Sequence, residues 1–151
     1  MIEKLATSAG SFTPRNMKYV ATSGQTIAAS AFTTLEWPTK IYDTENASLI
    51  TSNTEWEIQV SGKYDIYALS HIITGTGNAT LTMHIYVNGS SVSREVFAKT
   101  YLADTWNFVV EDTLELVATD VVSIVFDNSF VTPLSVDTGS GLNRFIIKKV
   151  D

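Results

Sequence analysis

Residues 63–74 are apolar on both of their alternating faces, and this limits the available folds more than any other feature of the sequence. The segment follows Gly62 and a strand-like stretch at 55–60. One side carries Tyr64, Ile66, Ala68 and Ile72, and the other carries Tyr67, Leu69, His71 and Ile73. An antiparallel sheet with one side in water keeps polar residues on that side. We therefore expect this strand to be covered twice, once by its own domain and once by another surface.

The chain from residue 26 onward has the pattern of short strands separated by turns. Candidate strands are 26–37, 41–42, 49–51, 55–60, 63–74, 79–87, 92–100, 106–117, 121–127 and 142–150. The segment 109–117 contains good helix formers, but apolar residues recur there with a period of two, which favours a strand. About ten strands without an amphipathic helix predict an all-β sandwich or barrel.

Residues 1–25 show neither the helical nor the strand period. They mix Ser, Thr and Gly with isolated apolar residues and contain the breakers Pro14 and Gly24. We expect an extended N-terminal arm at 1–25 and one domain at 26–151, since 151 residues suit a single domain. With 44% hydrophobic residues and no cysteine, the domain must be stabilised by packing.

Charge and hydropathy argue against nucleic acid and membrane partners. The formal net charge is -6, and the ten basic residues are scattered apart from Lys148 and Lys149, so no basic stripe faces a phosphate backbone. No window approaches the ~18 apolar residues of a membrane span, and the N-terminus lacks an apolar run of signal-peptide length. We expect a protein made in the cytoplasm and not exported by the ordinary route.

No set of residues predicts catalysis, a cofactor or a metal centre. The two histidines, His71 and His84, lack metal-ligand spacing, and no cysteine or Gly-x-Ser-x-Gly sequence supplies a nucleophile. Glu111 and Asp112 are adjacent on a predicted strand and therefore point to opposite faces. The segment 137–143, with Asp127 and Asn128, offers oxygens for calcium but lacks EF-hand spacing, and this alternative stays open.

Several spacings are similar to those of a known superfamily. Trp56 is followed after five residues by Gly62, and then Tyr64, Ile66 and Ala68 come at intervals of two. This order resembles the signature of the complement-q globular head within the tumour-necrosis-factor-like (TNF-like) superfamily. Further similar stretches are Leu49, LTMHIYVNG at 81–89, LELVATDVV at 114–122 and NRFIIKKV at 143–150. The chain departs from the signature at Thr44, where Asn or Asp is usual, and at Ala68, which replaces an aromatic residue.

The resemblance covers about 120 residues in order and implies a ten-stranded antiparallel jelly-roll sandwich that assembles as a homotrimer. One sheet of each subunit would face the threefold axis and give the second cover that residues 63–74 require. The period of two does not tell which face of this strand is the contact, although the resemblance points first to the face led by Tyr64. The candidate contact residues are therefore Tyr64, Ile66, Tyr67, Leu69, His71 and Ile73.

These observations predict a non-enzymatic, trimeric structural protein of a virus particle. The chain lacks a catalytic set, an export signal and the collagen-like stalk of secreted relatives. Compact jelly rolls recur on phage particles, so by analogy we expect a bacteriophage capsid decoration protein on the virion surface. Its arm would bind the major capsid protein or another virion protein.

Two other functions remain open. The first is a receptor-binding knob of a phage tail fibre or spike, which would contact a host glycan through Trp37, Tyr101 or Trp106. Aromatic residues of this size are often core residues instead. The second is a polysaccharide-active enzyme, for which the sequence offers no convergent pair of carboxylates.

Overall fold

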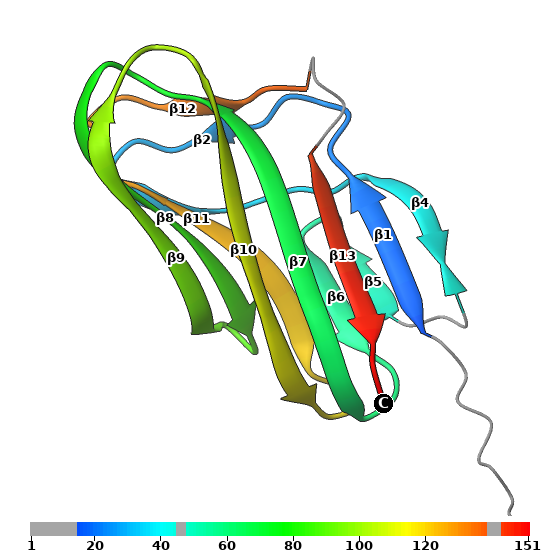
Figure 1. Cartoon of the computed structure of the whole chain (residues 1–151). Coiled ribbons are helices and arrows are strands. Elements are labelled where there is room, and N and C mark those ends of the chain that lie inside the picture. Colours follow the sequence, from blue (N-terminus) through cyan, green and yellow to red (C-terminus); the bar gives the residue numbers. More distant parts are fainter. Residues whose placement is uncertain (1–14, 45–47, 139–142) are drawn as a thin grey trace, which may run out of the picture.

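The computed structural model describes residues 15–44, 48–138 and 143–151, with residues 48–52 described by their backbone alone, and shows a two-layer sandwich of antiparallel strands (Figure 1). The described strands are β1 (Asn16–Val20), β2 (Thr26–Ile27), β3 (Ala31–Thr34), β4 (Thr39–Asp43), β5 (Ser48–Ser52), β6 (Glu55–Ile58), β7 (Gly62–Ile73), β8 (Gly77–Val87), β9 (Ser90–Tyr101), β10 (Thr105–Leu116), β11 (Val121–Asn128), β12 (Leu134–Val136) and β13 (Arg144–Lys149). Across these residues no helix is long and apolar enough to cross a membrane.

The strands form two sheets. Sheet A has the order β2-β12-β7-β13-β1-β4, with β10 on the other edge of β7, and sheet B has the order β5-β6-β11-β8-β9, with β3 beside β11. The chain passes from β7 in sheet A to β8 and β9 in sheet B, and then returns to sheet A with β10 (Figure 1). This exchange between two antiparallel sheets is a jelly roll, so the predicted all-β fold is confirmed.

The core lies between the sheets and contains the face of β7 led by Tyr64. Tyr64, Ile66, Ala68 and Ile72 are at most 1% exposed. The Trp56 ring, on β6 of sheet B, packs edge-on against two rings of sheet A, with centroids 5.4 Å from Tyr19 and 4.7 Å from Phe145. The aromatic residue of the sequence signature therefore joins the two layers.

The signature glycine has a local steric cause. Gly62 has φ +155°, and a Cβ placed there would lie 2.5 Å from the Lys149 side chain and 2.7 Å from Oδ1 of Asp151. The same Oδ1 accepts a hydrogen bond of 2.7 Å from the amide of Lys63. Hydrogen bonds from Lys149 and from the Lys63 backbone lower the pKa of the Asp151 carboxyl. Lys149 and Asp151 present only the ends of flexible side chains here, so the main reason for glycine at 62 is its φ of +155°, which other residues rarely adopt.

Two of the predicted boundaries are wrong. The predicted arm 1–25 includes β1, which pairs with β13 and β4 and buries Met17 and Tyr19 to 0% and 2% exposure. Five residues are too few for the period of two to stand out in a polar segment. The predicted strand 26–37 is divided into β2 and β3, and Ser30 between them has φ 49°. Residues 1–14 lie outside the described residues.

Candidate subunit interface

The outer face of sheet A, the side turned away from sheet B, carries the second apolar set of β7. Strand register places residues of five strands in rows across this face. One row is Tyr42, Lys18, Ile146, Tyr67 and Glu111, and the next contains Val20, Arg144, Leu69 and Val109. Tyr67, Leu69, His71 and Ile73 therefore face outward, as candidates for a subunit contact require.

Tyr64 and Ile66 do not belong to a subunit contact. They are 0% and 1% exposed between the two sheets, so their inclusion among the contact candidates is wrong. The expectation that the Tyr64 face is the first candidate for the subunit contact is wrong for the same reason. The physical reason is that alternation defines two faces without stating which one meets the partner sheet of the same chain.

The outer set is less exposed than the sequence suggests. Ile73 is 43% exposed and Tyr67 is half-buried, but Leu69 and His71 are only 8% and 6% exposed. Neighbouring strands lie about 4.8 Å apart, so side chains of β10 and β13 on the same face cover Leu69 and its neighbours. The face remains apolar at its centre, where half-buried Tyr67, Val109 and Ile146 adjoin one another.

One basic side chain packs against this centre. The guanidinium carbon of Arg144 lies 5.4 Å from the centroid of the Tyr67 ring, and Nη2 is 3.5 Å from the Tyr67 hydroxyl. Its Nε is buried and makes no hydrogen bond among the described residues. Arg144 thus holds the Tyr67 ring by a cation–π contact at the centre of the face.

Charges of opposite sign lie on the two sides of the face. On the β7–β10 side, a hollow of about 440 Å³ is lined by Asp65, Ile66, Tyr67, Glu111, Asp112 and Thr113. The Thr113 hydroxyl donates to Asp65 Oδ1 at 2.6 Å. The β13–β1 side carries two lysines. Lys148 lies opposite Asp65 of β7, and Lys18 lies opposite Ile146 of β13. The β7–β10 side also carries Lys63, whose Nζ lies 3.8 Å from Glu115 Oε1, so this side is acidic on balance while the β13–β1 side is basic.

Comparisons with known proteins bear on the fold. No family model and no curated protein matches the sequence. Crystal structures of murine APRIL at pH 8.0, 8.5 and 5.0 superpose with TM-scores of 0.65, 0.63 and 0.64 at 12%, 12% and 10% sequence identity. Each match covers 91% of this chain and 100% of the other. The chain has a TNF-like jelly-roll fold. At this level of identity, the likeness concerns the fold alone.

The described side chains considered for calcium include two asparagines that make hydrogen bonds within the jelly roll, while residues 139–142 of the candidate segment lie outside the described residues. Asn143 is fully buried, and its Oδ1 accepts from the amide of His71 at 2.6 Å while its Nδ2 donates to the carbonyl of Asp137. Asn128 is also fully buried, and its Oδ1 accepts from the amide of Phe130 at 2.9 Å. Asp127 precedes Asn128 on β11 of sheet B and lies opposite Phe32 of β3. Within the described residues, no three acidic or histidine side chains are grouped for a metal ion.

Two of the three glycan candidates belong to the core of the jelly roll. Trp37 and Tyr101 are 1% and 0% exposed, so neither ring is open to a sugar and these assignments are corrected. Burial raises the pKa of Tyr101 to about 12, and its hydroxyl donates to the carbonyl of Phe97 at 2.9 Å. Trp106 is half-buried, but Lys99 Nζ lies 3.7 Å from its ring centroid. Large aromatic rings at these positions fill the sandwich or are already covered.

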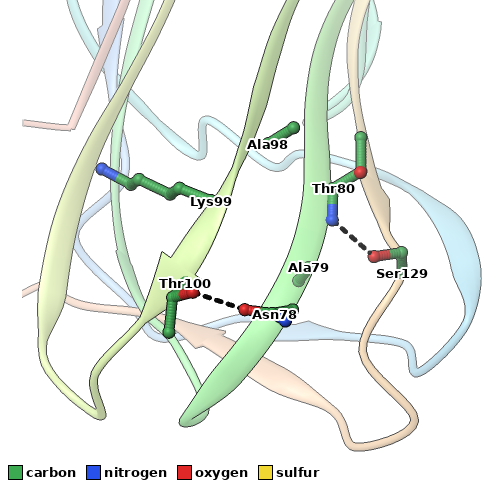
Figure 2. A pocket seen from close by; sticks show the side chains of 7 residues that line it. All are labelled: Asn78, Ala79, Thr80, Ala98, Lys99, Thr100 and Ser129. Atoms are coloured by element: carbon green, nitrogen blue, oxygen red, sulfur yellow. Dashed lines mark hydrogen bonds between the residues drawn. The ribbon is translucent and has the colours of Figure 1, made fainter.

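A polar hollow beside Trp106 is internally satisfied. It has a volume of about 450 Å³ and is lined by Asn78, Ala79, Thr80, Ala98, Lys99, Thr100 and Ser129 (Figure 2). The Thr100 hydroxyl bonds to Asn78 Oδ1, and the amide of Thr80 donates to Ser129 Oγ at 2.8 Å. Because these groups pair with one another, the hollow offers few free polar atoms to a ligand.

Proposed function

We propose that this protein is a non-enzymatic homotrimer that assembles through the outer face of sheet A and acts by binding other surfaces. The observation that carries the proposal is the apolar centre of that face, flanked by an acidic and a basic side on a TNF-like jelly roll. In a cyclic trimer each contact is heterologous, so the acidic side of one copy can meet the basic side of the next. This complementarity favours a second copy of the chain as the occupant.

The molar mass in solution tests the assembly. Three copies of the 16.5 kDa chain give a particle of about 50 kDa. We expect light scattering coupled to gel filtration to give this value at micromolar concentration and moderate salt. A single species at 16.5 kDa would contradict the proposed trimer.

We further propose that the trimer decorates the surface of a bacteriophage particle, and that residues 1–14 bind the capsid. Two features support this proposal: among the described residues no three acidic or histidine side chains are grouped for a metal ion, and residues 1–14 precede β1, the first described strand. The assignment to a bacteriophage particle itself is based on analogy with the compact jelly rolls of phage particles.

Deleting residues 1–14 should abolish binding to empty shells of the phage whose genome carries this sequence, while the molar mass stays at that of the full-length chain. The deletion must stop before Asn16, since removal of β1 would strip the buried Met17 and Tyr19 from the core. Cosedimentation with shells is the measurement. Unchanged occupancy by the truncated trimer would refute the role of the arm without affecting the trimer.

A further inference from the structure

The outer face of sheet B carries a second apolar surface, which we call the sheet-B patch. It consists of Phe32, Thr82, His84, Tyr86, Val92, Val96 and Val125. Phe32, Val92 and Val96 are 60%, 47% and 51% exposed. An apolar area that joins several strands on the outside of a sandwich marks an interaction site more often than scattered surface residues do.

Three rings form the centre of the patch. The Phe32 ring, from edge strand β3, reaches across β11 to lie 5.8 Å from the His84 ring on β8, and Tyr86 stands edge-on to His84 at 5.7 Å. His84 is only 5% exposed although it belongs to the outward row of β8, because these rings flank it. Phe32 therefore acts as a cover over a buried imidazole.

The imidazole has one unused nitrogen. His84 Nδ1 lies 2.9 Å from the hydroxyl of Ser91, whereas Nε2 is buried and has no hydrogen-bond partner among the described residues. Burial lowers the pKa of His84, an effect that Arg94 reinforces and Asp127 opposes. At neutral pH the ring is uncharged, so Nε2 is an unsatisfied polar atom beneath an exposed aromatic side chain.

We propose that the sheet-B patch binds a neutral saccharide. A sugar ring presents C–H groups that pack on aromatic faces such as Phe32 and Tyr86, and its hydroxyls both donate and accept hydrogen bonds. They can therefore satisfy His84 Nε2 in either tautomer, together with the Arg94 guanidinium and the Asp127 carboxylate at the rim. Phe32 has room to turn aside, since it is 60% exposed on a four-residue edge strand.

Charge and polarity argue against other occupants. The Asp127 carboxylate and the net charge of -6 oppose acidic glycans. An apolar protein surface would cover His84 Nε2, Arg94 and Asp127 without offering them partners, which is unfavourable for each buried polar group. The patch faces away from the outer face of sheet A, so it stays open in the proposed trimer and does not depend on that proposal.

The test is an array of neutral and acidic glycans, followed by titration of the best neutral ligand into the full-length protein. We expect Phe32→Ala to weaken binding at least tenfold, and His84→Phe, which keeps an aromatic ring but removes both ring nitrogens, to weaken it as well. Leu102→Ala is the matched control, since Leu102 is 67% exposed on the loop between β9 and β10. It should leave affinity unchanged.

Several results would overturn the inference. These are an absence of neutral ligands for the folded wild-type protein, a response to acidic glycans alone, and neutral-glycan binding that Phe32→Ala leaves intact. A protein partner that requires Phe32 in the absence of any glycan response would also overturn it. Circular dichroism of both variants would show that a loss of binding is not a loss of fold.

Discussion

Replacing Trp56 with alanine should lower the free energy of unfolding by ~3–5 kcal/mol. Trp56 is fully buried and its indole is in edge-on contact with Tyr19 and Phe145 from the opposite sheet. The substitution leaves a void between the layers that two rigid sheets cannot close. Since a domain is stable by only ~5–15 kcal/mol, this one change would remove a large share of the total.

The measurement is thermal unfolding at a fixed protein concentration, because the proposed assembly would make the midpoint depend on concentration. For a chain of this length we expect the midpoint to fall by ~6–20 °C. Trp106→Ala is the matched control. Because Trp106 is only half-buried, its replacement should lower the free energy of unfolding much less. A larger loss at Trp106 than at Trp56 would contradict the central position of Trp56. If Trp56→Ala does not fold, Trp56→Phe creates a smaller void and allows the same comparison.

The strand pattern of the sequence was enough to predict the fold class, and the reason is visible in β7 and β10. Both strands have 12 residues, and in β10 apolar residues recur with a period of two except at Asp112, which outweighs local helix propensity in residues 109–117. Short strands were not predicted, for the opposite reason. β1 has only five residues in a polar context, and its partners β13 and β4 lie far away in sequence. Pairing between distant strands leaves no local signal to recognise.

The candidate site was predicted only in part. Alternation grouped Tyr67 with Leu69 and Tyr64 with Ile66, but burial depends on which side the second sheet covers, and that is a property of the whole topology. The sheet-B patch was missed because its members come from four strands, and Phe32 reaches His84 across β11. The sequence around Phe32 does not indicate that its side chain contacts His84 across another strand.

Replacing Ile146 with glutamate should convert the proposed trimer into monomers and leave the jelly roll folded. Ile146 is half-buried at the centre of the outer face of sheet A, between Lys18 and Tyr67 in one row. In the monomer the new carboxylate lies beside Lys18, and an opposite-charge pair of this kind is tolerated or mildly stabilising. In the proposed trimer each of the three subunits would bury one such carboxylate. Each buried charge without a matched partner costs several kcal/mol.

Light scattering should therefore show a fall from about 50 kDa to the chain mass of 16.5 kDa, with the circular dichroism spectrum unchanged. Ile146→Val, which keeps an apolar side chain, should remain trimeric. Val117→Glu adds the same charge at a residue that is 59% exposed beyond the end of β10, and it should also leave the assembly intact. A trimer that survives Ile146→Glu but not Val117→Glu would place the contact elsewhere and remove the role proposed for sheet A. Dissociation by Ile146→Glu alone would tie the assembly to the face that β7 exposes.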